Sequence, residues 1–244
     1  MKSCVFAGPS LHGIEVPAGV KRYGPAALGS VYRAVEAGYL RIGIVDGLFG
    51  NVPSIWHKEI LYALCAGVEV AGAASMGALR AAELNSLGMV GIGRIYRLFR
   101  NGHWTDDDEV AVTHATEYLA FRPLSEAMCN IRFTLRRLRR CAAIDRALEA
   151  EIVARLKAKH FSGRTREELS RIVAAVAGDA ESQRIGPLFA TGYVDVKADD
   201  AQALLSYFAQ TIVPSPVPPA WAFPATALWR NQFVHDLADI PPLT

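Results

Sequence analysis

The chain has 244 residues, of which 51% are hydrophobic and 20% charged, and its formal net charge is +2. This composition is typical of a globular protein with a sizeable core and excludes a disordered chain. A net charge so close to zero gives no overall field for nucleic acid or a membrane surface, so we expect neither as a partner. The four cysteines form no C-x-x-C pair, which argues against a zinc site and favours reduced, cytoplasmic thiols.

The N-terminal part alternates strand-like and helix-like segments. Strands are predicted over residues 3–7, 40–45 and 68–71, and helices over residues 25–36 and 54–66. This order predicts an α/β fold, with a small three-layer core in which flanking helices cover a short parallel sheet. We expect a mainly helical C-terminal part to follow this core.

A tight turn joins the third predicted strand to the next helix. Residues 72–77 read Gly-Ala-Ala-Ser-Met-Gly, and Ser75 stands directly before the helix. The N–H groups at a helix start stabilise an oxyanion, so the turn approximates the nucleophile elbow of serine hydrolases. The match to G-x-S-x-G is incomplete, because Ala73 occupies the first glycine position. The alternative is a structural turn in which Ser75 caps the helix.

A serine nucleophile needs a base, and Lys58 is the first candidate. Its neighbours are mostly apolar, and burial among them would lower the pKa of the amine and make it a base. The alternative is a lysine that lies on the helix surface with its ammonium in water. Ser54 and Lys58 form a rival dyad at i and i+4, and His57 is the adjacent alternative base.

Ser10, Asp46 and Ser75 each follow a predicted strand. The carboxyl ends of parallel strands meet at one edge of a sheet, so one cleft is expected to hold all three. Asp46 precedes Gly47 and is either a turn residue or a hydrogen-bond partner of Lys58. Arg80 lies three residues before Glu83, a spacing that predicts an ordinary ion pair.

Two charged stretches lie in the second half of the chain. Residues 106–109, Asp-Asp-Asp-Glu, are either a metal site or acids that cap an apolar helix beginning at Val110, and the spacing favours the cap. Residues 132–140 carry a dense cluster of arginines on a helical segment. That cluster is either a solvated helix face or a docking face for an acidic partner.

Further helices are predicted over residues 144–159, 164–177 and 198–209, and residues 214–224 contain five prolines. Proline excludes a regular helix there, so an extended course is expected. We therefore predict a core domain over residues 1–122, a helical region over 123–213 and a proline-rich extended tail over 214–244.

Long ordered motifs resemble those of the TfuA-like family. They are F-A-G-P-S-L (residues 6–11), I-V-D-G-L-F (44–49), V-P-S-I-W-H-K-E-I-L-Y-A-L (52–64), G-A-A-S-M-G-A-L-R-A-A-E-L (72–84), G-M-V-G-I-G-R-I-Y (88–96) and D-D-D-E-V-A-V (106–112). The resemblance covers roughly residues 3–120, and residues past about 125 match no family by inspection.

This resemblance implies a partner of YcaO enzymes that install thioamides in ribosomally made peptides. TfuA-like proteins are understood to hydrolyse the thiocarboxylate of a ThiS-type sulfur carrier and so to release sulfide. The family's proposed Ser-Lys pair corresponds to Ser75 and Lys58. The supporting or substrate-binding residues are then Ser10, Asp46, His57, Met76, Gly77 and Arg80, of which Arg80 would hold the terminal group of the carrier.

A non-catalytic adaptor is the alternative function. It would bring the peptide substrate or the sulfur carrier to the YcaO enzyme without hydrolysing either. Neither function calls for a cofactor or a metal, and neither is expected.

Overall fold

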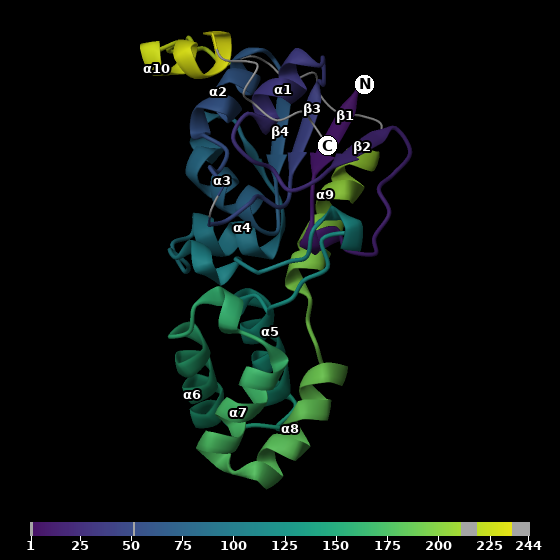
Figure 1. Ribbon diagram of the computed structural model, residues 1–244, viewed down its shortest axis with the longest axis vertical. Helices are drawn as coiled ribbons and strands as arrows, with labels where there is room; N and C mark the ends of the chain where they lie inside the picture. The colour runs from purple at the N-terminus through teal and green to yellow at the C-terminus, as the bar shows by residue number, and fades with distance from the viewer. Residues whose placement is uncertain (1, 51, 211–218, 236–244) are drawn as a thin grey trace. The chain divides into compact units, whose positions relative to one another are not determined.

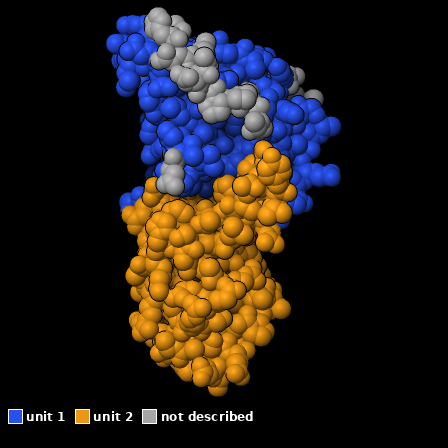
Figure 2. Space-filling model, in the orientation of Figure 1, with its two compact units in different colours: residues 1–105, 198–244 blue, residues 106–197 orange. Residues whose placement is uncertain are grey.

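The structure is a computed structural model and describes residues 2–50, 52–210 and 219–235. The chain divides into two compact units (Figure 2). Unit 1 comprises Met1–Thr105 and Ala198–Thr244, and unit 2 comprises Asp106–Lys197.

Unit 1 is built on a five-stranded sheet in the order β2-β1-β3-β4-β5, in which every neighbouring pair is parallel. Figure 1 labels strands β1 to β4 of this sheet. The strands are β1 (Ser3–Phe6), β2 (Val20–Tyr23), β3 (Arg41–Ile44), β4 (Glu69–Gly72) and β5 (Val90–Gly91). The predicted α/β class with a short parallel sheet is confirmed. The order is that of flavodoxin-like doubly wound folds, in which strand order reverses between β1 and β3.

Strands β2 and β5 were not predicted, and both lie at edges of the sheet. β2 carries Lys21 and Arg22, so it lacks the apolar run that marks a strand buried on both faces. β5 has only two residues, too few to give a strand pattern in the sequence. Short, charged strands are common at sheet edges, where they discourage pairing with another chain.

The helices of unit 1 cover both faces of the sheet. Phe6, Ile42 and Ile44 belong to a core shared with the first three helices, whereas Val5 and Ala71 belong to a core shared with α9. Because neighbouring residues of a strand point to opposite faces, these two cores form the predicted three layers. The helices are α1 (Ser30–Glu36), α2 (His57–Cys65), α3 (Met76–Leu84), α4 (Gly93–Arg100), α9 (Val196–Ala209) and α10 (Ala227–Arg230).

Gly43 makes room for α9 on the sheet. A Cβ at this position would lie 2.9 Å from Leu204 Cδ2 and 3.3 Å from the ring of Phe208. The absence of a side chain in the middle of β3 therefore lets the helix pack closely against the strand.

Two helices begin later than predicted. α1 begins at Ser30 rather than at Pro25, because Gly29 before it has φ of 86°, which is left-handed rather than helical. α2 begins at His57, three residues after Ser54. The N–H group of Trp56, which precedes α2, donates to the side chain of Glu59 at 3.0 Å and so sets the start of the helix.

Unit 2 is helical, and its core includes Ile131, Ile152, Val173 and Phe189. Its helices are α5 (Met128–Arg140), α6 (Arg146–Lys157), α7 (Arg166–Ala177) and α8 (Asp179–Thr191), with 3-10 turns at Asp107–Glu109, Glu117–Leu119 and Phe161–Gly163. α8 was not predicted, since Pro187 lies inside it and usually interrupts a helix. The mainly helical part after the core is confirmed.

The predicted domain boundaries, 1–122, 123–213 and 214–244, differ from the limits of the compact units. Packing of α9 on the sheet assigns the end of the predicted helical region to unit 1. Compactness does not test which segments fold on their own, so the boundaries stay a prediction. Of the predicted extended tail, residues 214–218 lie outside the described residues, and residues 219–226 have no regular helix or strand.

Among the described residues, the helices are all too short or too polar to cross a lipid bilayer.

Candidate functional site at the strand ends

The loops that follow β1 and β3 bring Ser10 and Asp46 together. Asp46 is buried, and its Oδ1 accepts a hydrogen bond from Ser10 Oγ at 2.7 Å. Its Oδ2 accepts from the N–H groups of Gly8 and Ser10, each at 2.9 Å. These loops leave the sheet where strand order reverses, which is where doubly wound folds bind ligands.

Arg22 lies beside this pair and was missed because β2 was not recognised. Its guanidinium donates to the carbonyl oxygens of Gly8 at 3.3 Å and Ile14 at 3.2 Å. Burial lowers the pKa of Arg22, and the charge of Asp46 opposes that shift. Arg22 therefore binds carbonyl oxygens of the loop after β1, and Asp46 binds N–H groups of the same loop.

Ser75 stands on a strained turn between β4 and α3. Ala74 before it has φ of 64°, an uncommon conformation for a residue with a side chain. Ser75 itself has φ of −118° and ψ of −124°, and only 2% of it is exposed. The strand, sharp turn and helix match the architecture of a nucleophile elbow, although the serine is buried.

Most N–H groups at the start of α3 already have acceptors. Those of Ser75 and Gly77 donate to the carbonyl oxygen of Val45, at 3.3 and 3.2 Å, and that of Ala78 donates to the carbonyl of Ser75 at 2.9 Å. The N–H of Met76 has no acceptor among the described residues. It is therefore the donor at this helix start that could stabilise an oxyanion.

Glycines in the turn have a packing role of their own. A Cβ on Gly77 would lie 1.7 Å from the carbonyl oxygen of Ile44, and one on Gly72 would lie 2.0 Å from the carbonyl oxygen of Gly77. Helix α3 can approach β3 and β4 this closely only because both positions lack side chains. The motif thus reflects helix–sheet packing as well as any chemistry at Ser75.

Lys58 contacts the C-terminal segment. Its ammonium donates to Thr226 Oγ1 at 2.8 Å and lies 5.9 Å from the centre of the Phe223 ring. Among the described residues, Lys58 donates no hydrogen bond to Ser75 or to Asp46. Ser54, the rival partner of Lys58, donates instead to the carbonyl oxygen of Leu48 at 3.4 Å.

His57 and Arg80 form a cluster with Glu83. Glu83 Oε2 lies 2.7 Å from His57 Nε2 and 2.8 Å from Arg80 Nη1, which confirms the predicted Arg80–Glu83 ion pair. Burial raises the pKa of Glu83, but His57 and Arg80 outweigh it and the net shift is downward. Glu83 lies two turns beyond Ser75 on α3, about 12 Å along the helix. The imidazole is therefore paired with a residue two turns from the serine.

Glu59 is a buried carboxyl that the sequence did not single out. It accepts the N–H groups of Trp56 at 3.0 Å and Tyr32 at 3.3 Å, and so joins the starts of α1 and α2. Burial raises the pKa of Glu59 to about 7, while hydrogen bonds from the backbone, including that of Trp56, oppose the rise. The local sequence around Glu59 does not indicate this role, because one of its two donors, Tyr32, belongs to α1.

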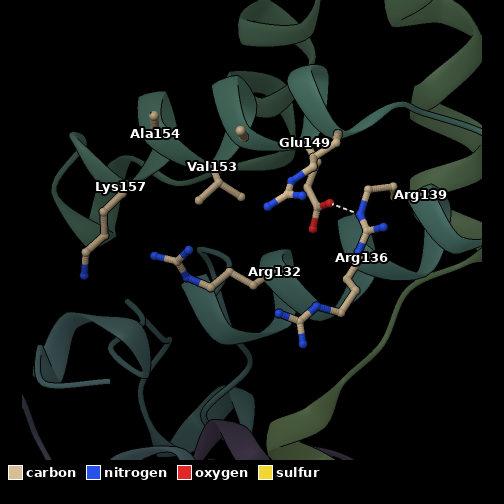
Figure 3. Close-up of a pocket in the computed structure, with 9 residues that line it drawn as sticks. Arg132, Arg136, Arg139, Glu149, Val153, Ala154 and Lys157 are labelled. Atoms are coloured by element: carbon tan, nitrogen blue, oxygen red, sulfur yellow. Dashed lines mark hydrogen bonds and ion pairs between the residues drawn. The ribbon is translucent and has the colours of Figure 1, made fainter. Parts of the chain in front are cut away.

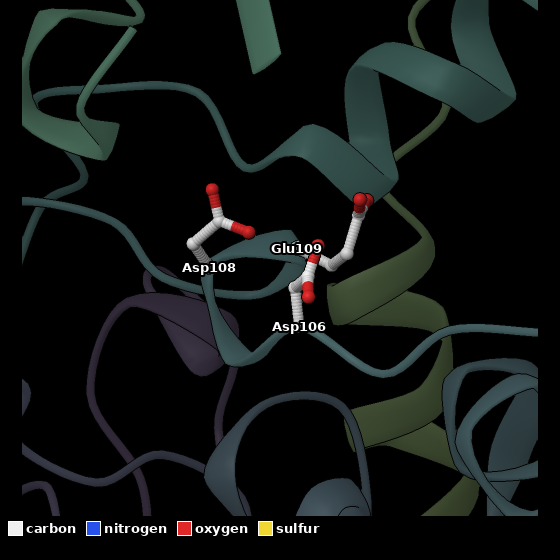
Figure 4. Close-up of side chains that lie close together, drawn as sticks. All are labelled: Asp106, Asp108 and Glu109. Atoms are coloured by element: carbon white, nitrogen blue, oxygen red, sulfur yellow. The ribbon is translucent and has the colours of Figure 1, made fainter. Parts of the chain in front are cut away.

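In unit 2, the acidic stretch is held by cations. Carboxylate oxygens of Asp106, Asp108 and Glu109 lie within 4.8 Å of one another (Figure 4). Lys157 Nζ contacts all three, at 3.2 Å from Asp106 and 3.0 Å from Glu109. Arg132 binds both oxygens of Glu109, at 2.8 and 2.9 Å. Ion pairs therefore account for the cluster.

The predicted apolar helix after these acids is wrong. Asp107–Glu109 form a single 3-10 turn, and residues 110–116 form no helix. The buried Arg164 explains part of this arrangement, because it donates to the backbone oxygen of Asp108 at 2.8 Å and pairs with the carboxylate of the same residue. The acidic side chains thus form ion pairs with Lys157 and Arg164 and do not cap a helix.

The fold and these polar side chains define a doubly wound α/β protein with a candidate serine site at the strand ends. The family model for TfuA-like protein matches residues 46–165. The chain belongs to the TfuA-like family, and the resemblance is confirmed. The match includes Asp46, Lys58 and Ser75, leaves out Ser10, and continues into unit 2 beyond the residues that carried the resemblance. A search of curated proteins finds no match to the chain.

Proposed function

We propose that this protein is a hydrolase that uses Ser75 to cleave the C-terminal thiocarboxylate of a ThiS-type sulfur carrier. The sulfide would supply a YcaO enzyme for backbone thioamidation of a ribosomally made peptide or protein. The observation that carries the proposal is the strained turn at Ala74, which places Ser75 between the end of a parallel strand and a helix start. A cytoplasmic location belongs to this proposal, supported by four free cysteines.

The reaction would proceed through an acyl-enzyme. Ser75 Oγ forms a bond to the thiocarboxylate carbon, the C–S bond breaks, and the sulfur leaves as hydrosulfide with the proton that the serine gives up. Water then cleaves the Ser75 ester and releases the carrier carboxylate and a proton. The N–H group of Met76 is the donor proposed for the oxyanion of both tetrahedral intermediates.

Lys58 is the base in this proposal, and it must exchange its present partner for Ser75. Its ammonium is bonded to Thr226, a hydroxyl on a segment that also packs on the rest of unit 1 through the buried Trp229 and Phe233. The long side chain of lysine allows such an exchange by rotation. Arg80 is proposed to bind the terminal group of the carrier, and the Ser10–Asp46 pair to fix the neighbouring loop.

A non-catalytic adaptor is the second candidate, and two observations favour it. Ser75 is 2% exposed, and Lys58 is bonded to Thr226 rather than to the serine. An adaptor would recruit the peptide substrate or the sulfur carrier to the YcaO enzyme without turnover. On this account the Gly72–Gly77 turn serves packing, for which Gly77 already has a clear steric reason.

Turnover of a thiocarboxylated carrier by the purified protein separates the two candidates. The hydrolase account predicts sulfide release that Ser75→Ala abolishes with the melting temperature nearly unchanged, since alanine fits the same small turn. Ser54→Ala is the matched control, because Ser54 lies in the segment before α2 and its hydroxyl donates to the carbonyl of Leu48, and it should keep full activity. Equal turnover by wild type and Ser75→Ala would exclude the nucleophile.

Partner capture tests the adaptor. If wild type and Ser75→Ala retain the carrier and the YcaO enzyme equally while neither releases sulfide, the adaptor account stands. If Ser75→Ala loses partner binding together with sulfide release, Ser75 has a structural role in the interface and is not a nucleophile.

A further inference from the structure

Helices α5 and α6 of unit 2 form a groove with basic walls (Figure 3). Arg132, Arg136 and Arg139 project from α5, while Arg146 and Lys157 lie near the two ends of α6. The groove has a volume of about 640 Å³, enough for several side chains of a bound segment. All of it falls within the region that matches the family.

Three of these cations already have carboxylate partners within unit 2. Arg132 binds Glu109, Arg139 binds Glu149, and Lys157 contacts the acidic stretch described above. These pairs fix the walls of the groove and neutralise part of its charge. Arg139 and Glu149 bridge the groove between the facing helices, as the dashed line in Figure 3 marks.

Arg136 and Arg146 are different, because neither has a carboxylate partner among the described residues. Both are exposed, and both line the same groove. Two unpaired guanidinium groups beside fixed ion pairs leave the groove with an excess of positive charge. An arginine fork binds a carboxylate through two parallel hydrogen bonds, which gives such a site a preference for that group.

The α6 wall supplies small, apolar contacts between the charges. Ala150, Val153 and Ala154 lie on this side of the groove. No aromatic side chain of the described residues lines it, so these residues offer no platform on which nucleobases could stack. The surface therefore fits acidic side chains separated by small apolar ones better than it fits a nucleic acid.

We propose that the α5–α6 groove binds an acidic peptide segment of a partner protein in an extended conformation. Carboxylates of the segment pair with Arg136 and Arg146, and its small apolar residues contact Val153 and its neighbours. The proposal rests on charge and shape in unit 2 alone. It holds whether or not Ser75 is a nucleophile.

The test is the binding of a fluorescein-labelled peptide of alternating Glu and Ala residues, followed by anisotropy at about 150 mM salt, where long-range attraction is screened. Replacing both free arginines, Arg136→Ala with Arg146→Ala, should weaken binding about tenfold or more. Arg137→Ala is the matched control, since Arg137 is exposed on the same helix but does not line the groove. It should change the affinity less than about twofold.

Melting temperatures of the variants establish that they are folded, and charge reversal completes the test. Arg136→Glu should lose the acidic peptide and gain affinity for the corresponding peptide of Lys and Ala. An equal effect of Arg137→Ala, or equal binding of a Gln-Ala peptide, would overturn the proposal. Tighter binding of a single-stranded oligonucleotide of the same charge would assign the groove to nucleic acid instead, and no binding of the acidic peptide would refute it.

Discussion

The strand ends of unit 1 and the groove of unit 2 both concentrate polar side chains, but they satisfy them differently. Asp46 and Glu59 are buried and accept hydrogen bonds mainly from backbone N–H groups. In unit 2, Lys157 and Arg132 pair with other side chains, and part of each pair is in contact with water. A buried acceptor that is lost leaves backbone donors unpaired, whereas a surface partner that is lost is replaced by water.

From this contrast we expect function and stability to respond differently to mutation in the two units. Changes at the strand ends should act steeply, because backbone geometry and burial hold each group in place. Changes in the groove should act mildly on stability and strongly on association with a charged partner. Mild effects at the strand ends together with steep losses of stability in the groove would contradict this contrast.

Lys58 should give the largest effect, on activity. General-base catalysis contributes about a thousandfold to a rate, so Lys58→Met should lose about that factor in sulfide release. Lys58→Arg should be equally inactive, since arginine stays protonated near neutral pH. Rates of sulfide release across a pH series provide the measurement. Substantial activity in the arginine variant would make Lys58 a fixed positive charge and remove the base from the mechanism.

Gly77→Ala should give the largest loss of stability. The new Cβ would lie 1.7 Å from the carbonyl oxygen of Ile44, so α3 must move off β3 at a cost of about 3 kcal/mol. Gly163→Ala is the control in unit 2, because nothing lies within 4 Å of its added Cβ. It should change the free energy of unfolding by less than about 1 kcal/mol. Urea denaturation measures both, and similar values would contradict the close packing of the turn.

Glu59 should make unit 1 less stable as the pH rises. Folded protein keeps the proton of this carboxyl up to a pKa of about 7, whereas the unfolded chain loses it near 4.5. The unfolding free energy should therefore fall between these pH values, by on the order of 3 kcal/mol. Glu59→Gln cannot titrate and should remove this part of the slope. A wild-type curve parallel to that of the variant would show that Glu59 titrates normally.

Asp108 should give the smallest effect, with the opposite sign. Burial raises the pKa of Asp108, but hydrogen bonds and ion pairs with Lys157 and Arg164 outweigh burial. The pKa is therefore lowered from its ordinary value of 3.8. Its stabilising contribution is therefore complete above pH of about 4 and is lost as the pH falls through the lowered pKa. Asp108→Asn should cost about 1 kcal/mol near neutral pH and nothing in strong acid. Thermal melts at both pH values, with Asp107→Asn as control, measure this difference.

The sheet could be predicted from sequence because most residues of its central strands are apolar. Chain order then places Ser10, Asp46 and Ser75 after parallel strands, and Ser10 does donate its N–H and hydroxyl hydrogen bonds to Asp46. The edge strand β2 was missed because Lys21 and Arg22 break the apolar run, and the role of Arg22 was missed with it.

Long-range packing set the contacts that sequence reasoning could not supply. Lys58 bonds to Thr226, 168 positions further along the chain, and no local pattern indicates that pairing. Glu59 acquires its two donors only when α1 packs beside α2. The acidic stretch was assigned to a helix cap because Arg164 and Lys157, its actual partners, lie about fifty residues away in the sequence. The arginine cluster of residues 132–140 is visible in the sequence. The groove is not, because its second wall is formed by helix α6.

Trapping the acyl-enzyme tests the central claim most directly. Purified protein would be mixed with thiocarboxylated carrier, stopped with acid during turnover, digested and analysed by mass spectrometry. The account predicts the C-terminal acyl group of the carrier as an ester on the peptide that contains Ser75, and its absence from Ser75→Ala. Sulfide release without an ester on Ser75, or with an ester on another residue, would contradict it.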